Sequence, residues 1–249
     1  MKRYQQPFAM ILAAIVTALS CPSLNAANPL QTKLQAKSDN TPYTYVLFYR
    51  SNDAATQKMN DVLQETLSQR DDSEVVAVKI DDPAQQALIK KFDATRLPMP
   101  TVAVLASNGA VCTVFPQRVS SSQLLAAMVS PAQARCLKAL QDEKLVLLCA
   151  QPSESASIPL GVRQFQSDAQ FAPRTEVVTV QARDPQEAKF LNQLRVRTDQ
   201  PSTMIAFMAP PGVMIGHFNS TVAFDTLAQK LAAAGKCCDD ENCKHHKKK

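Results

Sequence analysis

The sequence predicts an α/β protein made of two tandem copies of one unit, each with a central mixed sheet flanked by helices. Its 249 residues accommodate two domains of about 100 residues each. Strands and helices alternate early in each copy, which requires parallel strands joined by crossover helices. A turn signal at Ser107-Asn108-Gly109 then separates two apolar stretches and indicates an antiparallel hairpin. A mixed sheet accommodates both kinds of connection.

The first copy begins at Tyr43, where an apolar and aromatic stretch follows a polar one. Such a stretch is typical of a buried strand. Apolar residues at helical spacing, together with the Asp82-Pro83 start signal, predict helices between the strands. The expected elements are a strand at 43–49, a helix at 54–68, a strand at 74–80, a helix at 82–92, two strands within 96–111 and a helix at 120–130.

The second copy repeats this order. The segment EVVTVQARDP at 176–185 matches EVVAVKIDDP at 74–83 with an offset of 102 residues. A helix that passes into a strand is expected over 138–151, and the last helix is expected over 220–231. Agreement of motif, spacing and element order indicates a duplication. We therefore predict one domain over residues 43–130 and another over 131–235.

The N-terminus has the features of a secretion signal. Lys2 and Arg3 precede a short apolar run, and small residues follow near Ala26, as in a cleaved signal peptide. We predict a signal peptide over 1–26, a polar linker over 27–42, and a periplasmic or secreted protein. A lipid anchor at Cys21 is the alternative. The apolar run is too short for a spanning helix, and no other segment is apolar enough.

Charge and composition exclude several classes of function. The net charge is +5, but it resides mostly in the two ends, so the predicted domains are nearly neutral and unlike a nucleic-acid binder. Only five glycines occur, none at the spacing of a phosphate-binding loop. His217 is the single histidine of the predicted domains. We therefore expect no catalytic constellation in them.

The segment RLPMPTVAVLASNGAV at 96–111 resembles the thioredoxin superfamily. Pro100-Thr101 matches the family's cis-proline dipeptide, and Pro201-Ser202-Thr203 takes that place in the second copy. The resemblance covers residues 43–235 as two copies and implies two thioredoxin-like domains. The family's redox cysteines would begin the first helix, where this chain has Asp53 and Thr56.

No Cys-x-x-Cys motif occurs anywhere in the chain. Disulfide exchange needs an attacking thiolate and a resolving thiol, so neither copy is expected to be a dithiol oxidoreductase. In the second copy the corresponding residues are Ser153 and Ala156. The resemblance implies that the proline loops could still bind an extended peptide, and a purely structural turn is the alternative. The candidate peptide-binding residues are Met99, Pro100, Thr101, Gln200 and Pro201.

Three cysteines lie inside the predicted domains. Cys149 ends a hydrophobic strand and is expected to be a small buried residue, with a one-cysteine redox role as the alternative. Cys112 and Cys136 could form a disulfide in an oxidising compartment, but the sequence does not determine their geometry.

The tail at 236–249 concentrates cysteine, histidine and lysine without apolar residues. Thiolate and imidazole ligands suit copper or zinc. Disulfide formation and an unspecific basic tail remain alternatives. The candidate metal ligands are Cys237, Cys238, Cys243, His245 and His246.

Together these features predict an exported, redox-inactive protein with two thioredoxin-like domains that binds a protein or peptide or acts as a scaffold. Its tail would bind a soft metal, Cu or Zn. The alternative is a thiol-disulfide oxidoreductase or metallochaperone that works through the tail cysteines or Cys149. The sequence names no particular partner.

Overall fold

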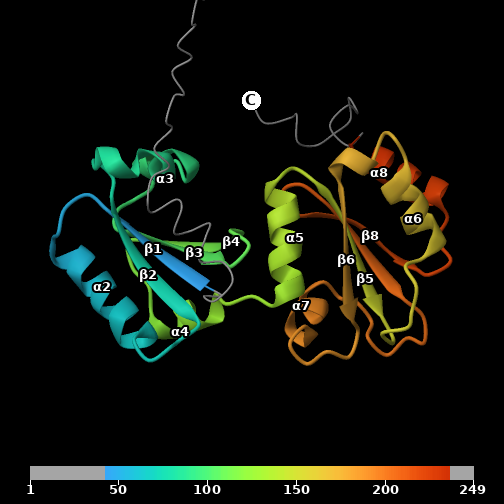
Figure 1. Cartoon of the computed structure of the whole chain (residues 1–249), viewed down its shortest axis with the longest axis horizontal. Coiled ribbons are helices and arrows are strands. Elements are labelled where there is room, and N and C mark those ends of the chain that lie inside the picture. Colours follow the sequence, from blue (N-terminus) through green and yellow to red (C-terminus); the bar gives the residue numbers. More distant parts are fainter. Residues whose placement is uncertain (1–42, 236–249) are drawn as a thin grey trace, which may run out of the picture.

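The computed structural model describes residues 43–235. The predicted signal peptide, linker and tail, with Cys21 and the candidate metal ligands, lie outside these residues. The described chain forms two four-stranded mixed sheets with flanking helices (Figure 1). The predicted fold class is thereby confirmed. Between residues 43 and 235, no helix is long and apolar enough to cross a bilayer.

The first sheet has the strand order β2-β1-β3-β4. Strand β1 pairs parallel with β2 and antiparallel with β3, and β3 pairs antiparallel with β4. The helix expected over 82–92 is a 3-10 turn at Pro83–Gln85 followed by a short α-helix, a common arrangement at helix starts. The elements are β1 (Tyr43–Tyr49), α2 (Ala54–Leu67), β2 (Ser73–Lys79), α3 (Gln86–Lys91), β3 (Thr101–Ala106), β4 (Val111–Pro116) and α4 (Ser121–Ala126).

The second sheet repeats this topology with the order β6-β5-β7-β8. Its first three strands have the same pairing directions as their counterparts. The offset of 102 residues holds for β1 and β5, for β2 and β6, and for α3 and α7, whereas α2 and α6 do not keep it. The elements are α5 (Pro131–Gln141), β5 (Leu145–Gln151), α6 (Leu160–Ser167), β6 (Thr175–Gln181), α7 (Ala188–Gln193), β7 (Met204–Ala209), β8 (Val213–Asn219) and α8 (Phe224–Gly235).

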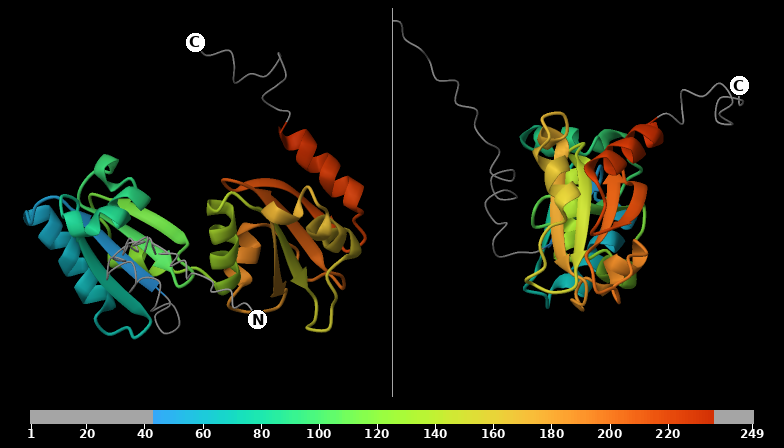
Figure 2. Two further views of the ribbon diagram at one scale, coloured as in Figure 1. Left: turned by 45° about the horizontal axis from the view of Figure 1, so that its top comes forward. Right: turned by 90° about the vertical axis from the view of Figure 1, so that its right-hand side faces the viewer.

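Helices pack on both faces of each sheet, but the two sheets differ in the number of helices on one face. On the second sheet, α5 and α7 pack on one face while α6 and α8 pack on the other (Figure 2). On the first sheet, α2 and α4 pack on one face, and α3 supplies the buried side chains of the other. The central strands β1 and β5 therefore lie between two apolar layers, as their continuous apolar sequence predicts.

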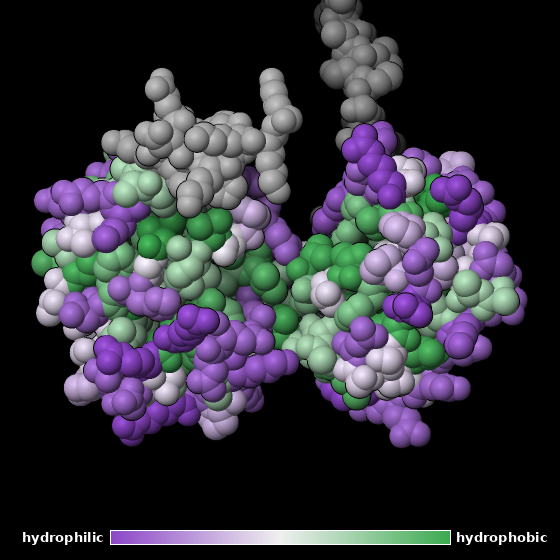
Figure 3. Space-filling view, turned by 180° about the vertical axis from the view of Figure 1, so that it is seen from behind, coloured by the Kyte–Doolittle hydropathy of each residue, from purple (hydrophilic) through white to green (hydrophobic). Residues whose placement is uncertain are grey.

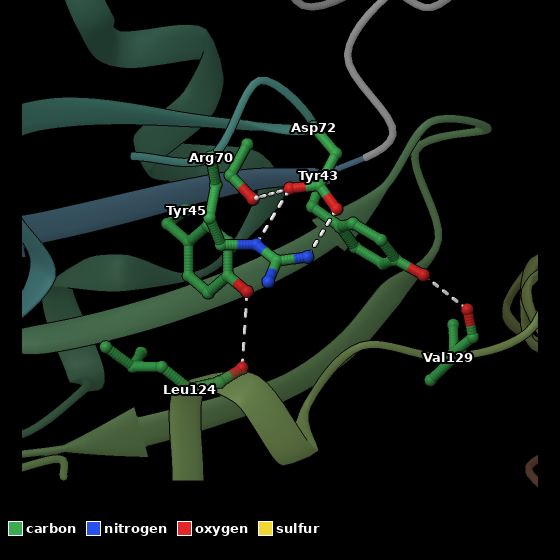
Figure 4. Close-up of polar contacts among 7 residues, drawn as sticks. Tyr43, Tyr45, Arg70, Asp72, Leu124 and Val129 are labelled. Atoms are coloured by element: carbon green, nitrogen blue, oxygen red, sulfur yellow. Dashed lines mark hydrogen bonds and ion pairs between the residues drawn. The ribbon is translucent and has the colours of Figure 1, made fainter. Parts of the chain in front are cut away.

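Two tyrosines at the start of β1 attach the segment that joins the units (Figure 4). The Tyr45 hydroxyl donates to the Leu124 carbonyl oxygen at 3.2 Å, and the Tyr43 hydroxyl donates to the Val129 carbonyl oxygen. Burial raises the pKa of Tyr45 to about 12, so this donor keeps its proton at physiological pH. Arg70 and Asp72 form an ion pair beside them. The chain leaving α4 is thus held against the first sheet.

Side chains from both units meet where α5 lies beside β4. The Asn108 side-chain amide donates to the Ala134 carbonyl oxygen at 2.8 Å. The Gln141 amide bonds to both backbone groups of Val111, at 2.9 and 2.8 Å, much as a neighbouring strand would. Ala106, Ala110 and Ala134 are buried together here, and hydrophobic side chains gather along this junction in Figure 3.

We predict that Gly161→Ala destabilises the protein. A Cβ at this position in α6 would lie 2.2 Å from the backbone oxygen of Val222, which cannot swing away as a side-chain end can. Overpacking of this kind costs about 1–3 kcal/mol. Chemical denaturation would measure the loss. Gly235→Ala is the matched control, because nothing lies within 4 Å of its Cβ position. Equal stability of the two variants would contradict the close approach of the backbones.

Candidate functional site

The candidate site lies at one end of the first sheet. Phe48, near the end of β1, pairs with Thr101 at the start of β3. The loop that leaves β1 for α2 and the proline loop that enters β3 therefore meet at the same end of the sheet. These are the two segments on which the sequence places the redox position and the peptide-binding candidates.

Asp53 and Thr56 form the cap of α2. The Asp53 carboxylate accepts the backbone N–H of Thr56 at 2.9 Å and the hydroxyl of Ser51 at 2.8 Å. These hydrogen bonds, the one from Thr56 foremost, lower the pKa of Asp53. A carboxylate also suits the positive end of a helix dipole. The two positions expected to hold thiols in the family thus hold a charged N-cap and the residue that it caps.

The proline loop leaves the backbone N–H and C=O of one residue, Met99, without a partner within the described chain. The Met99-Pro100 bond is cis. The Pro100 carbonyl oxygen accepts the backbone N–H of Gln117 at 2.6 Å, and the buried Thr101 hydroxyl donates to the Pro98 carbonyl oxygen. Met99 is partly exposed, and neither its N–H nor its C=O forms a hydrogen bond within the described chain. Hydrogen bonds therefore hold the residues on both sides of Met99, while the N–H and C=O of Met99 stay available to a partner.

The second unit does not reproduce this site. Strand β5 ends at Gln151, but α6 begins only at Leu160 and has no side-chain cap. Ser153 and Ala156 lie in the intervening loop, joined by a backbone hydrogen bond of 3.1 Å, and not at a helix start. The alignment of the two copies predicts Ser153 and Ala156 at a helix start, because the alignment does not include the longer loop between β5 and α6.

The expected position of Pro201 also needs correction. Ala150 pairs with Met204, whereas Phe48 pairs with Thr101, so buried Thr203 occupies the place of Pro100. The connection from α7 to β7 is one residue longer than that from α3 to β3, which displaces the proline. Pro201 is exposed, and the second cis bond among residues 43–235 is Pro210-Pro211, in the turn before β8. Gln200 and Pro201 therefore do not form a second copy of the Met99 loop.

The cysteines of the described chain are unsuited to thiolate chemistry. Burial raises the pKa of both Cys136 and Cys149 to about 12 and that of Cys112 to about 11. Cys149 is fully buried in the core of the second sheet. Cys112 and Cys136 are free thiols that pack in different clusters, so the disulfide considered between them does not form in this structure.

No metal site is found among residues 43–235, where no three Cys, His, Asp or Glu side chains cluster in a suitable way. His217 is exposed, and its Nε2 atom lies 2.7 Å from the carbonyl oxygen of Leu194. The five candidate ligands of the tail fall outside the described residues.

One buried acid was not anticipated from the sequence. Glu187 is only 3% exposed. Its carboxylate accepts the backbone N–H of Ala132 at 2.8 Å and the Ser130 hydroxyl, so it caps α5 from a different element. A carboxylate near a helix start is ordinarily expected on the surface. Its partners lie more than 50 positions away in the sequence, which no local pattern reveals.

Comparison with known proteins finds no matching family model and no matching curated sequence. Solved structures that resemble the chain include thioredoxin O2 from Arabidopsis thaliana, with 18% identity over 42% of this chain and 82% of that one, and a TM-score of 0.32. A domain of alkylhydroperoxide reductase AhpF from Enterococcus faecalis shares 15% identity over 83% of this chain and 98% of its own, with a TM-score of 0.29. The first two thioredoxin domains of Saccharomyces cerevisiae Eps1p share 12% identity over 80% and 94%, with a TM-score of 0.29.

The topology carries the assignment of the fold. Both sheets have a parallel pair followed by an antiparallel pair in the same order. Helices pack on both faces of each sheet, and a cis-proline precedes β3 in the first. Residues 43–235 therefore form two tandem domains with a thioredoxin-like fold.

Proposed function

We propose that this protein is an exported, redox-inactive module that binds an extended segment of another protein at the loop Met99-Pro100-Thr101. One observation carries the proposal. The unpaired backbone N–H and C=O of Met99 lie at the same end of the sheet as a helix start that bears a carboxylate cap where the family would carry a thiol. The loop at Met99 keeps backbone groups that a peptide could bind, whereas the start of α2 has a carboxylate in place of the thiol that disulfide exchange requires.

The proposed lack of redox chemistry is supported by the atoms at the start of α2. Disulfide exchange requires a sulfur that can attack and a second sulfur that can release the mixed disulfide. The Asp53 carboxylate and the Thr56 hydroxyl can do neither. The buried thiols of the described chain ionise only at strongly alkaline pH, and thiolate is the reactive form.

Binding at Met99 would add a strand to the open backbone of the proline loop. An extended peptide could accept from the Met99 N–H and donate to its C=O, as in other cases of strand addition. The hydrogen bonds from Gln117 and Thr101 hold the neighbouring residues in place. Such anchoring lowers the entropy that binding must remove. Backbone recognition of this kind is tolerant of the partner's sequence, which suits a scaffold.

The tail offers a second candidate function. Cys237, Cys238, Cys243, His245 and His246 supply soft ligands for Cu(I) or Zn(II). Titration of the reduced protein with either metal should show binding that disappears when residues 236–249 are deleted. Binding of equal strength in the deleted protein would exclude the tail as the site. Export rests on the N-terminal charge and apolar run, and the mass of the mature chain from its native source would test it.

We predict no reduction of insulin by the protein in the presence of dithiothreitol above the uncatalysed rate. The double substitution D53C/T56C should introduce activity, because it places two thiols at the start of α2 beside the proline loop. S153C/A156C is the matched control and should stay inactive, since these residues lie in a loop before α6. Activity of the unsubstituted protein would contradict the proposal. Replacing Cys237, Cys238 and Cys243 by serine, separately from Cys149→Ser, would then identify the responsible thiol.

We predict that a chemically unfolded probe, reduced and carboxymethylated lactalbumin, perturbs the amide resonances of Leu97, Met99 and Thr101, the residues of this loop that carry a backbone N–H. The resonances of Ser107–Gly109, at the opposite end of β3, should not move and serve as the internal control. The residues around Gln200 and Pro201 should also be unaffected, because that loop lacks the Met99 geometry. Perturbation of both loops, or of neither, would show that the unpaired backbone groups of Met99 are not the binding site.

A further inference from the structure

The first sheet has a face whose covering differs from that of its copy. In the second unit, α5 and α7 lie side by side on one face. In the first unit, α3 occupies the place of α7, and no helix of residues 43–235 stands in the place of α5. Thr44 and Val76 are partly exposed there, whereas their counterparts Val146 and Val178 are fully buried.

An unsatisfied polar atom marks the same place. The side-chain oxygen of Gln85 is buried and has no hydrogen-bond partner within the described chain. Gln85 stands 102 residues before Glu187, and the two units keep this offset throughout the surrounding elements. The Glu187 carboxylate accepts from Ser130 and from the N–H of Ala132 at the start of α5. Gln85 therefore occupies the position from which, in the second unit, Glu187 caps α5.

The same offset points to one segment of this chain. Residues 28–39 read NPLQTKLQAKSD, and residues 130–141 read SPAQARCLKALQ. Asn and Ser are both good N-cap residues, and each is followed by the proline favoured at the first helical position. Leu30 and Leu34 correspond to Ala132 and Cys136, which bury α5 against its sheet. Only residues 40–42 then separate the segment from β1, as residues 142–144 separate α5 from β5.

Charge is also retained. Arg135 of α5 forms an ion pair of 3.6 Å with Glu176 on β6. The residues at the corresponding positions are Lys33 and Glu74. The match weakens toward the end of the segment, where Lys37 and Ser38 replace Ala139 and Leu140. The sheet is more polar at that end as well, because Thr44 takes the place of Val146.

We propose that residues 28–39 form the counterpart of α5, a helix that packs beside α3 on the first sheet with its first turn at Gln85. The backbone N–H of Leu30 would satisfy the Gln85 oxygen, and Leu34 would lie over the sheet near Val76. Helix formation by so short a segment depends on such packing, since isolated helices of this length are marginal in water. This proposal differs from the expectation of a polar linker over 27–42, and it is independent of peptide binding.

Hydrogen exchange of the full chain, followed by mass spectrometry, tests the proposal. The amides of residues 32–39 should exchange at least about 100-fold more slowly than in an unstructured peptide. Leu34→Asp should abolish this protection and raise exchange in β2 and α3, with β5 unchanged as internal reference. Ala36→Asp is the matched control, because its counterpart Lys138 bonds with Asp142 at the surface, and it should retain the protection.

Three results would overturn the proposal. If the amides of residues 32–39 in the unsubstituted protein exchange at nearly the rate of an unstructured peptide, the proposed helix does not form, and the results for the variants cannot change that conclusion. Equal loss of protection in Leu34→Asp and Ala36→Asp would contradict the assigned packing face. Protection of β2 and α3 that rises with protein concentration would show that a second copy covers the face instead.

Discussion

The burial of one central strand on both faces is the constraint on which each unit depends. Strands β1 and β5 pair with one neighbour in parallel and with the other antiparallel. Because both faces are apolar, helices must cover both sides of the sheet. The parallel neighbour requires a crossover helix, and that helix starts where the central strand ends. The start of α2 and the entry to β3 are thereby brought to one end of the sheet, whatever residues occupy them.

The chemistry at that end depends on very few atoms. A helix start stabilises negative charge, and the same property that favours a thiolate also favours the carboxylate of Asp53. The Asp53 carboxylate caps α2 by accepting hydrogen bonds from the backbone N–H of Thr56 and the hydroxyl of Ser51. The adjacent backbone of Met99 remains unpaired within the described chain. In the proposed function, this end of the sheet binds an extended segment and does not support disulfide exchange.

The two units have diverged at their loops more than at their sheets. The offset between copies is 102 residues for the first two strands and for the α3 and α7 helices, but α2 and α6 do not keep it, and it changes again before β7. One additional residue before β7 puts Thr203 where the first unit has Pro100, and a longer connection moves the start of α6 away from β5. Buried polar residues diverged as well, because Glu187 caps a helix while Gln85 at the same position lacks a partner within the described chain. Function in the first unit therefore need not extend to the second.

The sequence by itself determined the features that depend on local pattern and on composition. Apolar periodicity identified the strands, the repeated motif identified the duplication, and the cysteine spacing excluded a dithiol site. Tertiary structure decided the rest, because strand pairing sets which residues oppose one another across the sheet. Pro201 aligns with Pro100 in sequence, yet hydrogen-bonded register places Thr203 there. The open backbone of Met99 and the capping of α5 by Glu187 likewise depend on contacts between distant segments, which no short-range sequence pattern reveals.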